Sequence, residues 1–406
     1  MSKSIQLEHR YSARNYAPLP AVITRGEGVW VWDEDGRRCL DMMSAYSAVS
    51  LGHAHPELVR VLAEQASRLA VVSRAFYNDR LPPLLEALCK LTGLDRALPV
   101  NTGLEAVETA LKAARKWAHK VKGVPEGRAE IVCCEGNFHG RSIAIVGMSS
   151  ETQYRDGFGP FPGGVVRIPF GDAAALERAI GPHTAAFLVE PIQGEGGIVV
   201  PPAGWLGRCA EICRAHGVLL IVDEVQTGLG RTGTMFAFEH DAIRPDGICL
   251  GKALGGGLLP VSAFVGTEAV MQVFTPGDHG STFGGNPLGA AVAVRTLELI
   301  ADGRLPERAA RLGERLMRGL RELRNPLVRE VRGRGLLVGL ELDTAVASAR
   351  EVAEALLAHG LLTKDTHGTV LRFAPPLTIG EDEIDFAVAT VGHVLGAILR
   401  GQPVAA

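Results

Sequence analysis

The chain has 406 residues, of which 47% are hydrophobic and 21% are charged, and its formal net charge is −3. This composition is typical of a globular protein with a sizeable core and more than one domain, and the charge excludes a surface field suited to nucleic acid. Since no apolar stretch approaches the ~18 residues of a membrane helix and the N-terminus lacks a signal or transit peptide, we expect a cytoplasmic protein without a membrane partner.

The seven cysteines are scattered along the chain, and none belongs to a C-x-x-C pair. An odd number of cysteines without metal-ligand spacing indicates free thiols in a reducing compartment. We therefore expect no metal site.

The N-terminal part of the chain predicts a hairpin and then helices. In GVWVWDEDGRRCLDM (28–42), two short alternating runs flank Asp35-Gly36, which is typical of a β-hairpin. Helical periodicity follows at 55–69 and again at 104–121.

Short apolar runs recur between the helices, and each ends at or beside a glycine, a proline or an acidic residue. Runs of this length are typical of buried strands, and their alternation with helices predicts a mostly parallel sheet covered on both faces. They lie at residues 129–136, 185–191, 217–224, 246–252 and 261–266.

The pattern changes near residue 294. A long amphipathic stretch, TLELIADGRLPERAARLGERLMRGLRELR, is followed by the strand candidates VRGRGLLVGLEL and TVLRFAPPL, and together they predict a separate, smaller α+β domain. We expect an N-terminal segment over 1–46, a large domain over 47–293 and a C-terminal domain over 294–406.

Glu190, Asp223 and Lys252 stand where three predicted strands end. Ligands of a parallel sheet bind beyond these carboxyl ends. Most lysines at a strand end keep the ammonium in water, but a desolvated lysine is a nucleophile that forms Schiff bases. Asp223 has two interpretations: a helix cap, or the carboxylate that keeps the ring nitrogen of pyridoxal phosphate protonated.

Two Gly-containing segments are candidates for phosphate binding. Asn101-Thr102-Gly103 opens the predicted helix 104–121. A phosphate there would meet free backbone N–H groups and the positive end of the helix dipole, although an ordinary helix cap explains the same residues. GLGRTG at 228–233 fits G-x-G-x-x-G, but five residues separate it from its strand, so we reject a dinucleotide site there.

The order of these and other motifs resembles that of the class III, ornithine-type, pyridoxal phosphate-dependent aminotransferases from about Asn15 almost to the C-terminus. The resemblance implies a fold-type I architecture and pyridoxal 5′-phosphate as the cofactor. It rests on NYAPLP, MSAYSAVSLGHAHP, SRAFYN, NTGLEAVETALKAARKW, GNFHGR, DGFGPF, VEPIQGEGG, VDEVQTGLGRTG, LGKALGGG, HGSTFGGNP and RFAPPL, in this order.

The resemblance assigns the cofactor contacts position by position. It implies that Lys252 forms the Schiff base with the cofactor and later moves the proton as general base and acid. Asp223 would pair with the ring nitrogen, and Gln226 with the ring hydroxyl. Phe138 and Val225 would cover the two ring faces.

The resemblance also implies how the cofactor phosphate is held. Gly103 and Leu104 would donate backbone N–H groups to it. Ser281 and Thr282 lie in a Gly-rich loop, and in this family the threonine reaches the phosphate of the neighbouring subunit. A homodimer or larger homo-oligomer with its active site at the interface is therefore expected.

Substrate recognition by resemblance rests on five side chains. Glu195 would neutralise Arg372 while the amine donor is bound, and would move away when the α-carboxylate of 2-oxoglutarate takes its place. Arg141 would hold the distal carboxylate. Tyr16 and Tyr46 would shape the pocket for L-ornithine.

The expected activity is transfer of the δ-amino group of L-ornithine to 2-oxoglutarate, which yields glutamate 5-semialdehyde, cyclising to pyrroline-5-carboxylate, and glutamate. Relatives that act on N-acetylornithine or 4-aminobutyrate generally lack a tyrosine at position 46, so Tyr46 favours ornithine over an acetylornithine-, 4-aminobutyrate- or lysine-type ω-aminotransferase. A racemase on the same scaffold would need no keto acid, and a non-catalytic binding protein would not need Lys252.

Several positions depart from the animal ornithine enzymes. His139 stands where they carry tryptophan, and Leu104, Gly196, Gly256 and Phe283 also differ from their usual residues. These differences bear on substrate range rather than on cofactor binding.

Overall fold

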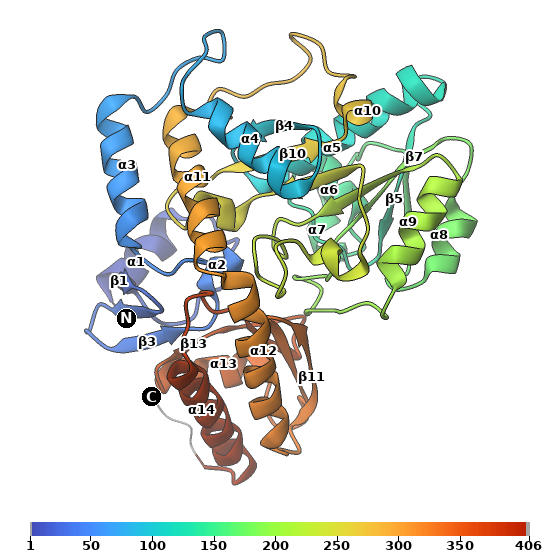
Figure 1. The fold of residues 1–406 in the computed structure, drawn as a ribbon. Helices are drawn as coiled ribbons and strands as arrows, with labels where there is room; N and C mark the ends of the chain where they lie inside the picture. The colour runs from blue at the N-terminus through green and yellow to red at the C-terminus, as the bar shows by residue number, and fades with distance from the viewer. Residues whose placement is uncertain (1, 403–406) are drawn as a thin grey trace.

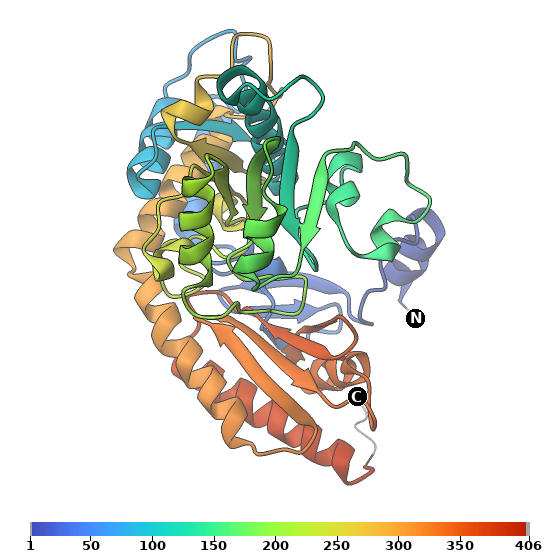
Figure 2. The same ribbon diagram turned by 90° about the vertical axis from the view of Figure 1, so that its right-hand side faces the viewer.

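The computed structural model describes residues 2–402, and Figure 1 shows a larger part above a smaller, C-terminal part. The larger part is built on a seven-stranded sheet and the smaller part on a four-stranded sheet. Another four-stranded sheet, mostly N-terminal, lies between them (Figure 2).

The large sheet is mostly parallel. Its strands lie in the order β4-β10-β9-β8-β7-β5-β6, and only β10 runs antiparallel to its neighbours β4 and β9. The mostly parallel sheet predicted from the sequence is thereby confirmed. The strands are β4 (Arg96–Val100), β5 (Glu130–Cys134), β6 (Val165–Ile168), β7 (Thr184–Val189), β8 (Leu219–Asp223), β9 (Gly247–Leu250) and β10 (Ser262–Gly266).

Consecutive residues of the central strands point to opposite faces of this sheet. On β7, Phe187 and Val189 pack into one hydrophobic cluster, whereas Ala186 and Leu188 pack into another. All six residues of β7 are buried. Both faces must therefore be covered by other elements, which explains the uninterrupted apolar run in the sequence.

Helices supply this cover. Apolar side chains of α5, α6 and α10 belong to the cluster on one face, and those of α3, α4, α8, α9 and α11 to the cluster on the other. The helices predicted at 55–69 and 104–121 correspond to α3 and to α5 with η1. The helices are α3 (Pro56–Arg68), α4 (Leu81–Thr92), α5 (Gly103–Trp117), η1 (Ala118–Lys122), α6 (Ile143–Met148), α7 (Thr152–Arg155), α8 (Ala173–Ala179), α9 (Trp205–Ala215), η2 (Ala237–Asp241), η3 (Lys252–Gly255), α10 (Glu268–Met271) and α11 (Pro287–Asp302).

The N-terminal sheet combines both ends of the chain. β2 and β3 form the predicted hairpin. β3 also pairs in parallel with the C-terminal strand β13, so the N-terminal strands belong physically to the smaller part. The elements are α1 (Lys3–Tyr11), β1 (Ile23–Glu27), β2 (Trp30–Asp33), β3 (Arg38–Asp41), α2 (Ser44–Ser47) and β13 (Leu361–Leu362).

The remaining C-terminal elements form the four-stranded sheet β11-β12-β15-β14 and its helices. Its long helices α12 and α14 pack against each other. Strands were expected in VRGRGLLVGLEL and TVLRFAPPL, and both segments contain them. The elements are α12 (Leu305–Glu322), β11 (Val328–Arg334), β12 (Leu337–Leu342), α13 (Ala349–Ala358), β14 (Lys364–Thr366), β15 (Val370–Phe373) and α14 (Glu381–Leu399).

The long amphipathic stretch after residue 294 forms two helices rather than one continuous element. α11 ends at Asp302, and α12 begins at Leu305 with Pro306 in its first turn. Arg304 between them is left-handed, with φ +48°. A proline cannot continue a preceding helix but is well suited to start a new one, so the chain breaks here. The domain boundaries at 46/47 and 293/294 stay predictions, and the second falls inside α11.

Every helix between residues 2 and 402 is too short or too polar to cross a membrane.

Gly335, in the turn between β11 and β12, packs directly on the GLGRTG segment. Its φ is +55°, and a Cβ placed there would lie 2.5 Å from the carbonyl carbon of Thr232 and 2.6 Å from the carbonyl oxygen of Arg231. The next residue, Leu336, donates its N–H to the same Arg231 oxygen at 3.0 Å. This contact joins the smaller part to the larger part without space for a side chain.

We expect Gly335→Ala to lower the free energy of unfolding by about 2–4 kcal/mol, because it adds overpacking to the cost of a positive φ. Gly368→Ala is the matched control, since Gly368 has φ +73° but nothing within 4 Å of its Cβ position. That control should cost about 1 kcal/mol. Urea unfolding midpoints measure both, and equal shifts would contradict the proposed close contact.

Candidate active site

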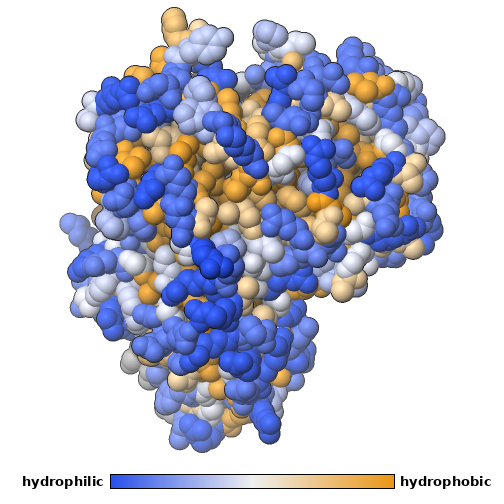
Figure 3. Space-filling view, viewed as in Figure 1, coloured by the Kyte–Doolittle hydropathy of each residue, from blue (hydrophilic) through white to orange (hydrophobic). Residues whose placement is uncertain are grey.

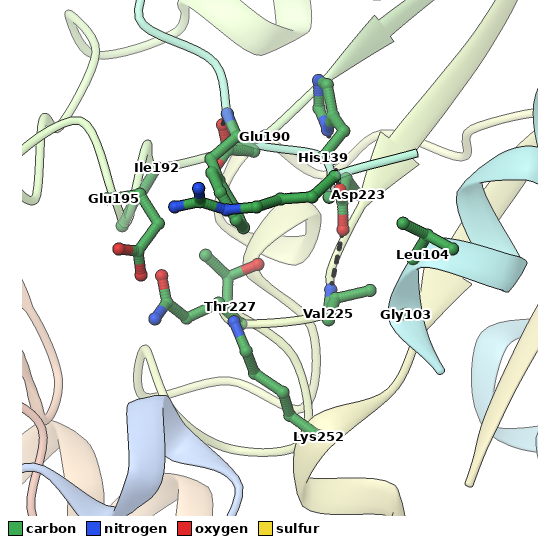
Figure 4. Close-up of a pocket in the computed structure, with 14 residues that line it drawn as sticks. Gly103, Leu104, His139, Glu190, Ile192, Glu195, Asp223, Val225, Thr227 and Lys252 are labelled. Atoms are coloured by element: carbon green, nitrogen blue, oxygen red, sulfur yellow. Dashed lines mark hydrogen bonds and ion pairs between the residues drawn. The ribbon is translucent and has the colours of Figure 1, made fainter. Parts of the chain in front are cut away.

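The carboxyl ends of β7, β8 and β9 open onto one cavity of about 250 Å³. Glu190, Asp223 and Lys252, which follow or end these strands, all line it, as expected for ligand binding beyond a parallel sheet. In Figure 4 the Lys252 side chain enters from one side, with Asp223 and His139 across from it. The lining residues are Gly103, Leu104, Phe138, His139, Gly140, Arg141, Glu190, Ile192, Glu195, Asp223, Val225, Gln226, Thr227 and Lys252.

Lys252 opens the short helix η3 and has a left-handed backbone, with φ +42°. Its side chain is largely buried. Burial lowers the pKa of the Lys252 amine below its ordinary value, although the carboxylates of Glu195 and Asp223 act in the opposite direction. A buried amine that loses its proton readily is a nucleophile for an aldehyde carbon.

Asp223 and His139 form a buried pair at the far wall of the cavity. The Nδ1 of His139 and the Oδ2 of Asp223 are 2.7 Å apart, and both side chains are almost fully buried. The Val225 N–H donates to the other oxygen, Oδ1, at 3.0 Å. Burial lowers the pKa of His139, but the hydrogen bond and charge of Asp223 outweigh it, so the pKa is raised overall. The carboxylate is thus fixed in orientation.

The N-terminus of α5 forms another wall. Thr102 caps the helix in a capping box with Glu105. The N–H groups of the first turn, which include Gly103 and Leu104, have no partner within a helix. A Cβ on Gly103 would lie 2.6 Å from Val225 Cγ1. Glycine therefore lets the helix end approach the residue that follows β8.

Glu190 connects two loops of the site. Its Oε2 accepts the Phe138 N–H at 3.0 Å, and its Oε1 accepts the Gly194 N–H at 3.2 Å. Gly194 in turn packs so closely on Gln226 that a Cβ would overlap the amide oxygen, at 1.4 Å. Burial raises the pKa of Glu190 to about 7, with His139 opposing this shift.

Glu195 and Arg372 form a two-pronged ion pair beside the cavity. Arg372 Nη1 lies 2.5 Å from Glu195 Oε1, and Nη2 lies 3.0 Å from Oε2. The guanidinium also lies over the Tyr46 ring, 5.0 Å from its centre. Although burial raises the pKa of Glu195, the charge and hydrogen bonds of Arg372 lower it overall. The two side chains therefore form a charge-assisted, two-pronged contact.

Arg141 lies at the mouth of the cavity on aromatic side chains. Its guanidinium is 4.3 Å from the Tyr154 ring centre and 5.6 Å from that of Phe138. The two rings meet edge to face, with their centres 5.9 Å apart. These contacts hold the Arg141 charge near the cavity, and no carboxylate of residues 2–402 forms an ion pair with it.

Other predicted site residues lie outside the cavity of this single chain. Tyr16 is 74% exposed. Thr282 is also exposed, and Ser281 accepts a hydrogen bond from Asn101 Nδ2 at 2.9 Å, beside the start of α5. The roles assigned to these three residues remain predictions.

Sequence reasoning left some lining residues without a role. Glu190 was recognised only as a strand-end residue, although its place beside Asp223 on the neighbouring strand was a usable signal. Gly140, Ile192 and Thr227 each lie within three positions of an assigned residue in a loop, and the sequence could not predict which loop residues face the cavity.

The residues present suit pyridoxal phosphate. The cavity offers an amine at Lys252, a carboxylate of fixed orientation at Asp223 for a ring nitrogen, and a helix N-terminus at Gly103 for a phosphate. Within residues 2–402, no three or more His, Cys, Asp or Glu side chains form a group suited to a metal ion.

Comparison with known proteins agrees with this chemistry. The family model described as aminotransferase class-III matches residues 11–395. The chain is 53% identical over 401 residues to the ornithine aminotransferase of Geobacillus sp. (strain WCH70), covering 98% of this chain and 100% of that one.

Solved structures are similar over nearly the whole chain as well. The crystal structure of the ornithine aminotransferase from Toxoplasma gondii ME49 superposes with a TM-score of 0.96 at 43% identity, covering 98% of this chain and 96% of that one. The acetylornithine aminotransferase from Elizabethkingia anophelis superposes with a TM-score of 0.88 at 45% identity, covering 97% and 98%.

Glu224, directly after β8, supplies a pH test of this region. Its carboxylate accepts hydrogen bonds from Thr227 Oγ1 and, at 2.9 Å, from the Phe238 N–H. Burial raises the pKa of Glu224 to about 7 from an ordinary 4.5. The pKa of Glu224 is higher in the folded than in the unfolded state. The stabilising contribution of the protonated carboxyl is therefore complete below pH 4.5 and is lost as the pH rises to about 7.

Between pH 5 and pH 8 we expect the wild type to lose up to roughly 3 kcal/mol of unfolding free energy relative to Glu224→Gln, which cannot ionise. Urea midpoints of both proteins at the two pH values test this difference. The exposed Glu314→Gln should follow the wild type. A Glu224→Gln protein with the wild-type pH dependence would contradict the raised pKa.

Proposed function

The chain belongs to the class-III aminotransferases, and on that basis we infer that it transfers the δ-amino group of L-ornithine to 2-oxoglutarate, with pyridoxal phosphate as cofactor. The products are glutamate 5-semialdehyde, which cyclises to pyrroline-5-carboxylate, and glutamate. The ornithine aminotransferase of Geobacillus sp., at 53% identity over nearly the full length, supports this activity.

The ion pair of Glu195 with Arg372 is the observation that carries the proposal. One pocket must accept a donor with a free terminal amine and then an acceptor with an α-carboxylate. While Glu195 holds Arg372, the ion pair has no net charge and a cationic donor is tolerated. When Glu195 turns away, Arg372 becomes a two-pronged carboxylate site.

Lys252 and Asp223 carry the chemistry. When bound, pyridoxal phosphate supplies a ring that withdraws electrons from the carbon that loses its proton. Asp223, fixed by His139 and the Val225 N–H, keeps a positive charge stable at the ring nitrogen. Lys252 Nζ, whose pKa is lowered by burial, takes the proton from the amine-bearing carbon and returns it.

An acetylornithine-type donor range is the alternative, because the Elizabethkingia anophelis acetylornithine aminotransferase is as similar in sequence as the Toxoplasma gondii ornithine enzyme. The identity to these two solved structures therefore does not by itself select the donor. Tyr46 on Arg372 favours L-ornithine, since its ring occupies space beside the carboxylate site. Arg141 is proposed to bind the distal carboxylate of 2-oxoglutarate.

A homodimer or larger homo-oligomer is proposed with the active site at its interface. Phe76, Tyr77 and Phe283 are 67%, 103% and 57% exposed, although large aromatic side chains favour burial. Leu288, in the first turn of α11, donates its N–H to the Ala70 carbonyl, so the segment before Phe76 and Tyr77 contacts the start of the helix that follows Phe283. Figure 3 shows further apolar side chains gathered across the face seen in Figure 1. In such a dimer Thr282 would serve the partner's cofactor phosphate.

The proposed cytoplasmic location is supported by the free thiols. All seven cysteines are unpaired. Burial raises the pKa of the Cys133 thiol to about 12, which keeps it protonated and unreactive. Free, inert thiols suit a reducing compartment.

Single-turnover mixing tests the donor. We expect L-ornithine to change the cofactor absorbance at least tenfold faster than N-acetylornithine, 4-aminobutyrate or lysine, with the product trapped as pyrroline-5-carboxylate. Lys252→Ala should bind the cofactor but show no covalent attachment by mass spectrometry after borohydride reduction. Full turnover by this variant would contradict the role of Lys252, and a faster donor would contradict the role of Tyr46.

Subunit complementation tests the shared site. Co-expressed Lys252→Ala and Thr282→Ala chains each lack one essential group. If Thr282 acts across the interface, a mixed dimer contains one intact site and regains up to about half of the wild-type activity per dimer. If Thr282 acts within its own chain, no intact site forms and activity stays at the level of the separate variants.

A further inference from the structure

The residue that favours ornithine, Tyr46, lies in an unusual turn. Ser44, Ala45, Tyr46 and Ser47 have φ values of +42°, +47°, +60° and +74°, so four consecutive residues other than glycine are left-handed. Each such residue costs about 1–2 kcal/mol. A turn of this kind persists only where surrounding contacts determine it.

Hydrogen bonds from both sides hold the start of the turn. Asp41 Oδ1 accepts the N–H groups of Met43 and Ser44, both at 2.8 Å. Ser44 Oγ donates to the Ala374 carbonyl at 2.6 Å, and the Ala374 N–H donates to Met42 at 2.7 Å. The turn is therefore fastened to the chain just after β15.

Arg231, in the GLGRTG segment, forms further hydrogen bonds between the turn and the smaller part. Its side chain is fully buried. Nη1 donates to the carbonyls of Pro375 and Leu336, at 2.6 and 3.0 Å. Nη2 donates to the hydroxyls of Ser50 and Ser44, at 3.2 and 3.4 Å. One guanidinium thus joins the segment that contains the turn to two segments of the smaller part.

Burying this guanidinium is costly. Its hydrogen bonds go to carbonyl and hydroxyl oxygens, and Nε has no partner among residues 2–402. Burial lowers the pKa of Arg231 to about 9. An apolar residue would fill a core position at lower cost. Fixing the relative position of two backbone segments is a function that an apolar side chain could not perform.

The two segments carry the residues that meet at the donor pocket. Pro375 follows Arg372 by three positions, and Ser44 precedes Tyr46 by two. The Tyr46 ring lies 5.0 Å from the Arg372 guanidinium. We propose that Arg231 is a positioning residue for donor specificity. It holds the left-handed turn that contains Tyr46 in a fixed position relative to β15, the strand that contains Arg372. This proposal rests on the ornithine activity proposed above.

The test is the ratio of kcat/KM for L-ornithine to that for 4-aminobutyrate. A ratio is independent of the fraction of folded enzyme, so a purely structural role would not change it. We expect Arg231→Lys to lower the ratio at least tenfold, since an ammonium cannot reach both segments with the same geometry. Ser44→Ala is the second variant, in case Arg231→Lys fails to fold. It removes the hydrogen bonds of Ser44 Oγ with Arg231 and with the Ala374 carbonyl without changing a charge, and should lower the ratio at least threefold.

Arg308→Lys is the matched control. Arg308 also donates to backbone carbonyls of the smaller part, those of Thr378 and Ile379, but it does not contact the turn. It should lower the melting temperature and leave the ratio within twofold of wild type. Pyridoxal phosphate absorbance checks that each variant holds its cofactor.

The outcomes separate the two proposals. A wild type without preference for L-ornithine would overturn the proposed function. A wild type that prefers L-ornithine, together with Arg231→Lys or Ser44→Ala variants that keep the full ratio, would overturn the positioning role alone. A ratio that falls equally in Arg308→Lys would also overturn it, because general loosening would then explain the effect.

Discussion

The ion pair between Arg372 and Glu195 is the contact on which the arrangement of the site depends. Arg372 belongs to β15 of the smaller part, and Glu195 follows β7 of the large sheet, so the pair joins the two parts of the molecule at the cavity. Thr366 Oγ1 donates to the Glu195 carbonyl at 2.9 Å from the same side. A change of charge in the pocket therefore affects the contacts between the larger and the smaller part.

Charge in this site is controlled by burial and by fixed partners together. Lys252 is made less basic by burial, while Glu195 stays ionised because Arg372 faces it. Asp223 is held by His139 and by the Val225 N–H, so its carboxylate keeps one orientation toward the cavity.

The sequence was sufficient to predict the features that depend on local pattern. The β2–β3 hairpin, the buried strands and the convergence of Glu190, Asp223 and Lys252 follow from turn chemistry, apolar runs and the strand-end rule. Contacts between distant segments could not be predicted in this way. The left-handed turn at Tyr46 has no glycine or asparagine to indicate it, and nothing in the GLGRTG segment indicates that Arg231 contacts Ser44 and Pro375.

The pairing of β3 with β13 bears on how the chain is synthesised. Leu40 and Leu361 are partners in one sheet although about 320 residues separate them. During translation the large sheet can form while the N-terminal hairpin still lacks its neighbour, so the edge of β3 stays unpaired until β13 has been synthesised. That strand edge is the segment for which protection by a chaperone during synthesis has most value.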